Sequence, residues 1–143
     1  MMKLTNLTGF LIHRTDVKLT NFFSRKKLKP YNVTPEQWGI ISTLDEHRAT
    51  TQKEVALAID KDQTTVVRMI HSLEAKGIVK RIVNPHDKRS HDLFLSEKGV
   101  ELKKSLLVNV MEAHDYITRS LTQDEVKQLH DLLGKVYSNV LDD

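Results

Sequence analysis

The stretch that decides the fold is Asp87-Lys88-Arg89-Ser90-His91-Asp92-Leu93-Phe94-Leu95-Ser96-Glu97-Lys98-Gly99. It joins a charged hairpin tip, an apolar strand and the start of a helix within thirteen residues. It comes directly after a segment whose pattern is typical of a helix, a short turn and a second helix. This order of elements describes a winged helix-turn-helix, and a basic wing is suited to holding DNA.

The helix-turn-helix is predicted from a helix cap, a polar turn and a residue that ends a helix. Thr51-Gln52-Lys53-Glu54 has the form of a capping box and opens the first helix. After the polar turn Asp60-Lys61-Asp62, a second helix is expected to run to Lys76 and to end at Gly77, a residue type that favours the left-handed conformation found at helix ends.

The hairpin is predicted from two short runs of β-branched and apolar residues that are separated by turn residues. Residues 78–83 are apolar around two basic positions, Asn84-Pro85 interrupts the strand, and Leu93-Phe94-Leu95 resumes it. The wing is therefore expected at residues 84–91.

The rest of the chain is predicted to be helical, because it has few glycines and prolines and its apolar residues recur at three- and four-residue spacing. A first helix is expected from about Thr5 to Lys27, before the Lys29-Pro30 step. A second should open with the capping box Thr34-Pro35-Glu36-Gln37, and the last two should be capped by Ser96 and by Thr122. This makes six helices and one hairpin, with Trp38, Ile41 and Leu44 of the second helix directed inward.

Composition narrows the function classes. The chain has 143 residues, enough for one domain with a real core, and its 22 Lys and Arg against 19 Asp and Glu give a net charge of +3. A polyanionic partner is plausible on this balance but is not required by it. The absence of cysteine excludes disulfides, thiolate metal sites and thiol-based sensing. No long apolar run or signal peptide is visible, so no membrane segment is expected and the cytoplasm is the expected compartment.

The second helix of the motif carries the predicted base-reading residues. Val66, Met69, Ile70 and Leu73 have the spacing of one buried stripe. The opposite face presents polar side chains that fit base edges in a major groove, since Arg bonds guanine, Gln bonds adenine and Thr methyls touch thymine. These candidate DNA-binding residues are Gln63, Thr64, Thr65, Arg68 and His71. Taken alone, such a face fits an ordinary solvated helix surface better, and the neighbouring wing is what favours DNA.

The wing supplies four further candidates. Asp87 and Arg89 stand two residues apart on a tight loop, where a carboxylate is expected to orient the guanidinium for a minor groove. His86 and Lys88 add charge for phosphates. The alternative is a surface ion pair that contributes no more than about 1 kcal/mol to folding.

The chain resembles the MarR family of bacterial transcriptional regulators in its general, SlyA-like form. The resemblance covers nearly the whole chain and rests on the segments starting at Thr34, Thr51, Thr65 and Leu73, together with Asp87-x-Arg89 followed by Leu95-Ser96-x-x-Gly99. It implies an intertwined homodimer, a two-fold symmetric operator and often a small aromatic or anionic effector. Arg68 matches the family's recognition-helix arginine and Arg89 its wing arginine. Ser96 stands where Thr is commoner, which keeps the helix cap.

We therefore expect a mainly α protein with a two-stranded hairpin wing and a helical dimerisation region. Residues 1–143 form a single MarR-like domain, with the winged helix-turn-helix lobe at 34–96 and the dimerisation region at 1–29 and 97–143. The expected function is that of a homodimeric repressor that binds double-stranded DNA and is relieved by a small-molecule effector. Two alternatives stay open: a DNA-binding protein without an effector, and a helical protein-interaction module or antirepressor without DNA binding.

Effector and catalytic residues are less well marked. His13, Arg14 and Trp38 are candidates for an effector pocket, although Trp38 also fits a core position. His114 with its acidic neighbours is the best local metal cluster, and without Cys or HxxxH spacing no metal or other cofactor is expected. Ser90-His91-Asp92 cannot act as a triad, because adjacent strand residues point to opposite faces. No catalytic residue is assigned, and the chain is not expected to be an enzyme.

Overall fold

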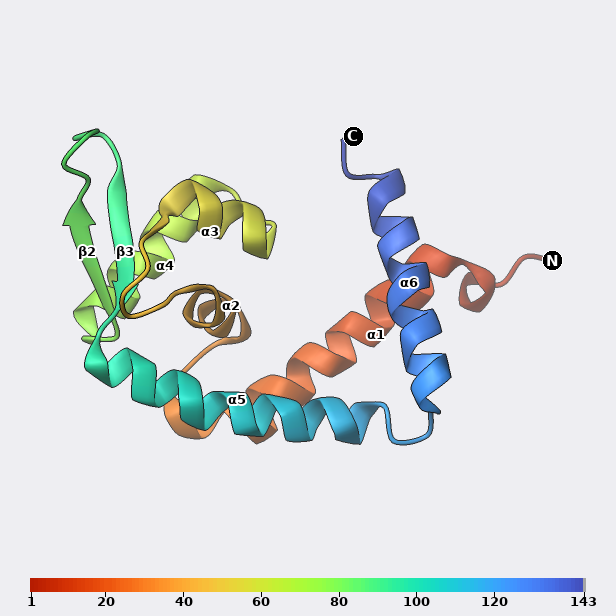
Figure 1. Ribbon diagram of the computed structural model, residues 1–143. Coiled ribbons are helices and arrows are strands. Elements are labelled where there is room, and N and C mark those ends of the chain that lie inside the picture. The colour runs from red at the N-terminus through yellow and green to blue at the C-terminus, as the bar shows by residue number, and fades with distance from the viewer. Residues whose placement is uncertain (143) are drawn as a thin grey trace. The chain divides into compact units, whose positions relative to one another are not determined.

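The computed structural model describes residues 1–142 (Figure 1). Over these residues the chain forms six α-helices and one antiparallel sheet of three strands. The helices are α1 (Thr8–Phe23), α2 (Pro35–Thr43), α3 (Gln52–Ile59), α4 (Gln63–Ala75), α5 (Glu97–Ile117) and α6 (Gln123–Asn139), and the strands are β1 (Thr50–Thr51), β2 (Val79–Val83) and β3 (His91–Leu95). The predicted winged, mainly α fold is confirmed.

The chain divides into two compact units. The first unit, Met1–Asn109, holds α1 to α4, the sheet and the first half of α5, and the second begins at Val110 and holds the rest of α5 and α6. No helix within residues 1–142 combines the length and the apolar character that a membrane span requires.

Side-chain caps set most of the helix starts. In the box at α2, the Gln37 backbone N–H donates to Thr34 Oγ1 and the Thr34 N–H donates to Gln37 Oε1, each at 3.1 Å. Thr122 and Glu125 form the same reciprocal pair at α6. At α3 only half of the expected box is present, since Thr51 Oγ1 accepts from the Glu54 N–H. These caps satisfy donors that a helix start leaves without partners.

The N-terminal helical segment differs from the single helix predicted from about Thr5 to Lys27. A 3₁₀ turn at Leu4–Asn6 precedes α1, and after Phe23 the chain continues as a π-helical turn, Ser24–Leu28, and a 3₁₀ turn, Lys29–Tyr31. The wider turn brings Leu28 into the core, where it is 1% exposed. The tighter turn that follows has Pro30 near its start, and Lys29 before it keeps right-handed helical angles (φ -54°, ψ -42°).

The sheet has the order β1-β3-β2, with every pair antiparallel. In the wing, Val79 pairs with Leu95 and Val83 with His91. The strand β1 was not predicted, because two residues carry no alternation pattern and its pairing with Leu93 and Asp92 joins distant parts of the chain.

The core of the first unit lies where α2, α3, α4 and the sheet meet. Ile40, Ile41, Leu44, Val55 and the α4 stripe are fully or nearly fully buried, and Trp38 packs against them half-buried. The predicted inward positions Ile41 and Leu44 are therefore confirmed, and the predicted stripe of α4 is buried at Val66, Ile70 and Leu73, with Met69 half-buried beside them.

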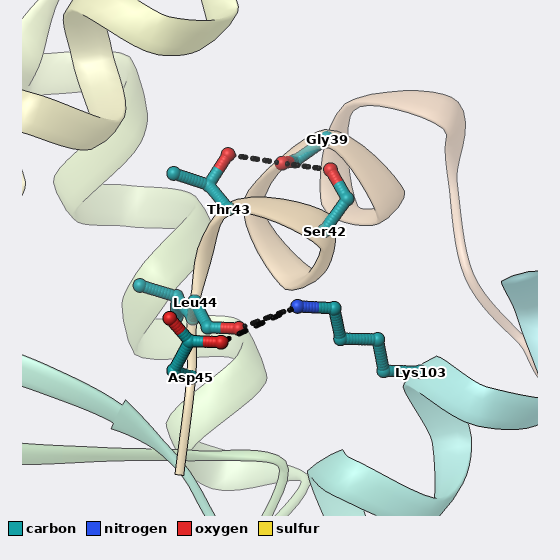
Figure 2. A network of polar contacts seen from close by, with 6 residues as sticks. All are labelled: Gly39, Ser42, Thr43, Leu44, Asp45 and Lys103. Atoms are coloured by element: carbon teal, nitrogen blue, oxygen red, sulfur yellow. Dashed lines mark hydrogen bonds and ion pairs between the residues drawn. The ribbon is translucent and has the colours of Figure 1, made fainter. Parts of the chain in front are cut away.

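Helix α5 is attached to this core by close contacts at its first turns. Ser96 Oγ accepts from the Gly99 N–H as the predicted cap and donates to the carbonyls of Gly77 and Ile78. Lys103 Nζ donates to the Leu44 carbonyl at 2.9 Å and lies 3.8 Å from the Asp45 carboxylate, at the end of α2 (Figure 2). The start of α5 is thereby fixed to both the sheet and α2.

Candidate nucleic-acid interface

The outer face of α4 begins with an acidic cap. Asp62 Oδ2 accepts from the Thr65 N–H at 3.0 Å, and Asp62 Oδ1 accepts from the Thr65 hydroxyl at 2.7 Å. The hydrogen bond from the Thr65 hydroxyl is the main cause that holds the pKa of Asp62 below its ordinary value, and the bond from the Thr65 N–H comes next. The charge of Arg68 lowers that pKa further. Asp62 was not recognised as a cap from the sequence, although Asp directly before a helix with Thr three residues later is a usual signal for one.

Three of the predicted base-reading side chains, Gln63, Thr64 and Arg68, are exposed on α4. The Arg68 guanidinium makes no hydrogen bond with any residue that the structure describes, so its donors face solvent or a ligand. Thr65 differs, because it is half-buried and its hydroxyl is already engaged by Asp62. Gln63, Thr64 and Arg68 are thus the exposed polar side chains of this face, and Thr65 serves the cap.

The wing loop between β2 and β3 is ordered by Asn84. Its side-chain oxygen accepts from the backbone N–H groups of His86 and Asp87 at 2.8 and 3.2 Å, and its amide donates to Asp92 Oδ1 at 3.1 Å. The Asn84 N–H also donates to the Ser90 carbonyl at 2.9 Å. This role of Asn84 was missed from the sequence, although Asn at the start of a turn often bonds the backbone two residues further on.

The predicted ion pair between Asp87 and Arg89 is wrong. Asp87 Oδ1 accepts a hydrogen bond at 3.0 Å from the backbone N–H of Arg89, and the Arg89 guanidinium forms no ion pair within residues 1–142. In a tight loop the short carboxylate reaches the N–H two residues on more readily than the distal end of a long side chain. Asp87 therefore shapes the turn, and the side chains of His86, Lys88 and Arg89 are exposed around it.

His71 is also exposed on α4, and it is bonded to the wing strand. Arg81 of β2 has Nη1 3.0 Å from His71 Nε2, and its Nε donates to Glu74 Oε2 at 3.3 Å. Arg81 is one of the two basic residues of the predicted strand at 78–83. In the structure its guanidinium reaches α4, so the neighbouring cations of the wing surface are Lys80, Lys88 and Arg89. Figure 1 shows β2 and β3 as a narrow hairpin beside α4, with its tip projecting past α3.

The predicted effector residues do not share a contact in the structure. His13 and Arg14 are exposed on α1, with the Arg14 guanidinium 6.0 Å from the centre of the Phe10 ring. Trp38 packs on the core of the lobe. A hollow of about 380 Å³ lies one to two turns further along α1, lined by Asp16 and Thr20 and by residues of α2 and of the α3 end, among them Gly39 and Ile59.

His114, which the sequence marks with its acidic neighbours as the best local metal cluster, has one imidazole ring and one carboxylate close to it. His114 and His130 have ring centres 6.0 Å apart, and His114 Nδ1 lies 3.7 Å from Asp115 Oδ1. Within residues 1–142, no three or more His, Cys, Asp or Glu side chains are grouped as metal ligands.

Comparison with known proteins decides the family. The model of the MarR family matches residues 33–91, the segment that contains most of the lobe and all of the wing loop. A crystal structure of a mutant of MarR from E. coli, complexed with operator DNA, superposes with a TM-score of 0.82 and is 30% identical, covering 90% of this chain and 91% of that one. The chain belongs to the MarR family.

Other MarR relatives agree over most of the chain. The transcriptional regulator MgrA of Staphylococcus aureus is 29% identical over 129 residues, which are 89% of this chain and 85% of that protein. The PcaV regulator of Streptomyces coelicolor, solved with its natural ligand, has the same fold with a TM-score of 0.87 over 99% of both chains at 19% identity. The protein is accordingly a MarR family transcriptional regulator and not an enzyme, as its sequence indicated.

Proposed function

We propose that this protein is a homodimeric repressor that binds a two-fold symmetric operator in duplex DNA and works in the cytoplasm. The observation that carries the proposal is the exposed face of α4 beside a wing whose tip presents unpaired cations. The related MarR of E. coli, of which this chain covers 91%, was solved with operator DNA. The alternative, an antirepressor without DNA binding, has no use for a wing that holds Lys88 and Arg89 outward.

The two elements have different proposed tasks. Arg68, Gln63 and Thr64 read base edges in the major groove, with Thr65 ordering the helix start and His71 at the far end of the face. At the wing, Arg89 enters the minor groove, His86 and Lys88 contact phosphates, and Asp87 holds the turn. Phosphate contacts fix position, and base contacts carry sequence information.

The proposed dimer is formed by residues 1–29 and 97–143, outside the lobe at 34–96. Helix α6 has no buried residue, yet one of its faces is apolar. That face comprises Leu129, Leu132, Leu133, Val136, Tyr137 and, at the C-cap, Val140, each between 40% and 60% exposed. An apolar stripe of this length needs a second surface to cover it. We assign that surface to a second copy of this chain.

We also propose that a small aromatic or anionic effector relieves repression. His13 and Arg14 would supply the polar contacts and Trp38 an aromatic wall. None of the three lines the hollow at Asp16, Thr20 and Gly39, whose volume is in the range of small-molecule sites. PcaV, which shares the fold, was solved with a natural ligand. A ligand that binds the DNA-free conformation more tightly would lower operator affinity. The alternative is a repressor without an effector, for which no ligand would change the affinity.

DNA binding is tested by selecting duplexes from a random library with the purified protein. The selected duplex is then titrated at rising salt. Three cations per protomer, Lys80, Lys88 and Arg89, bring six positive charges to the DNA in a dimer, so the slope of log affinity against log salt should be about −5. Sedimentation of the free protein should give twice the chain mass of 16.5 kDa. Failure to enrich any duplex would support the antirepressor instead.

A further inference from the structure

Arg81 links the wing to the recognition helix through two side chains of α4. Its Nε donates to Glu74 Oε2 at 3.3 Å, and its Nη1 lies 3.0 Å from His71 Nε2. The side chains of Arg81 and Glu74 are 27% and 38% exposed, so the contact is partly shielded from water. Because Arg81 lies on β2 and its partners lie on α4, the two contacts help to set the angle between the strand and the helix.

The contact with His71 fixes the protonation state of the imidazole. A guanidinium has only donors, so His71 Nε2 must offer its lone pair and the ring must be neutral, with its proton on Nδ1. A protonated ring offers no acceptor and would place a second positive charge about 3 Å from Nη1. Protonation of His71 and the hydrogen bond from Arg81 therefore exclude each other.

Few other charged groups bear on this imidazole. On α4 they are Arg68 and Glu74, each three residues away, and β2 contributes Arg81. In the described residues, neither α2 nor α3 places a charged side chain in a hydrogen bond or ion pair with His71. Histidine is the side chain whose ordinary charge change falls between pH 5 and 8.

We propose that Arg81 and His71 form a proton-sensitive link that positions the wing against α4, so that protonation of His71 lowers the protein's discrimination between its operator and other DNA. The proposal rests on the proposed DNA-binding role of α4 and the wing. With neutral His71, both bonds from Arg81 hold the two DNA-reading elements at one angle, which favours sequences that fit both. With protonated His71, one bond is lost and the surface gains a positive charge, which favours phosphates of any sequence.

The experiment compares two affinities of the full-length protein at pH 8 and pH 5.5, at fixed ionic strength. One probe is the duplex selected from the random library, and the other is a shuffled duplex of the same composition. The ratio of the two affinities should fall about fivefold between pH 8 and pH 5.5, the order expected from the loss of one ordinary hydrogen bond. Affinity for the shuffled duplex should not fall.

Variants separate the link from other effects of pH. In His71→Gln, the amide oxygen still accepts from Arg81 and does not titrate, so the ratio should be the same at pH 8 and at pH 5.5, whatever its level. In Arg81→Lys, one ammonium cannot serve both partners in the same geometry, so the ratio should already be low at pH 8. His47→Gln, at an exposed histidine in the loop after α2, is the matched control and should behave as wild type. Circular dichroism at each pH verifies that the variants are folded.

The outcomes distinguish this proposal from the proposed function. A wild-type ratio that does not change with pH, or one that changes equally in His71→Gln, overturns the link and leaves DNA binding intact. If the wild-type protein selects no duplex at pH 8, it is the DNA-binding proposal that fails.

Discussion

Replacing Gly99 by alanine should destabilise the protein because α5 begins against the backbone of Ile78, directly before β2. A Cβ added to Gly99 would lie 2.2 Å from the carbonyl oxygen of Ile78 and 3.2 Å from Leu95 Cδ2. A carbon and an oxygen in contact are ordinarily separated by roughly 3.3 Å, so the helix and the strand would have to separate by about 1 Å. The atom in the way is backbone, which cannot rotate aside as a side chain can.

The magnitude follows from three contributions. Overpacking in a close contact costs about 1 to 3 kcal/mol, with the upper end appropriate for a backbone atom. The Ile78 carbonyl also accepts from Ser96 N and Ser96 Oγ at 2.9 and 3.1 Å, and lengthening these bonds costs about 1 kcal/mol each. Alanine recovers about 1 kcal/mol through its higher helix propensity. We therefore expect Gly99→Ala to lower the free energy of unfolding by about 2 to 4 kcal/mol.

The assay is urea denaturation followed by circular dichroism, at one protein concentration because a dimer's stability depends on it. Gly134→Ala is the matched control. Gly134 lies in α6 with no atom within 4 Å of the added Cβ, and its spacing places it away from the apolar face. This control should be more stable than wild type by up to about 1 kcal/mol. If Gly99→Ala matched the wild type while Gly134→Ala gained stability, the close packing of α5 on Ile78 would be refuted.

Three further predictions concern the interface and its helix cap. Arg68→Ala should cost about 1 to 3 kcal/mol of binding and relax the preference at one position in each half-site, and a uniform loss across all core sequences would contradict base reading. Arg89→Ala should flatten the dependence of affinity on A·T-rich flanks, measured with duplexes that vary only there, and Asp87→Ala should partly reproduce that loss by loosening the turn. Because the pKa of Asp62 is lowered on folding, its carboxylate stabilises the protein above its unfolded pKa and this stabilisation is lost as the pH falls from about 4 towards 2. The difference in stability between wild type and Asp62→Ala should therefore shrink over that range, whereas a constant difference would show that the ionised form is not what stabilises the helix.

Local signals in the sequence predicted most of the elements. The boxes at Thr34 and Thr122, the cap at Ser96 and the stop at Gly77 each depend on contacts between residues a few positions apart, so the sequence order reveals them directly. The residue Gly77 has φ +75°, the left-handed conformation that its type favours. The apolar stripe of α4 is equally visible, because a helix places residues three and four apart on one face.

The features that were missed depend on contacts between distant residues or on competition for one acceptor. Strand β1 exists because Thr50 pairs with Leu93, which no local pattern encodes. The direction of Arg81 is decided by Glu74 and His71 on another element. At the wing, the charges of Asp87 and Arg89 suggested an ion pair, but a nearby backbone N–H was the easier partner for the carboxylate. Sequence patterns thus predicted a candidate interface, and the structure shows which of its side chains face outward.

The proposal that the protein binds DNA as a homodimer is tested most directly by hydroxyl-radical footprinting of the protein on its selected duplex. Two lobes that each place an α4 in the major groove should protect two half-sites related by two-fold symmetry, about 10 base pairs apart or a multiple of that spacing. Additional protection at the flanks should disappear in Arg89→Ala. A single asymmetric footprint, or uniform weak protection along the whole duplex, would contradict the account.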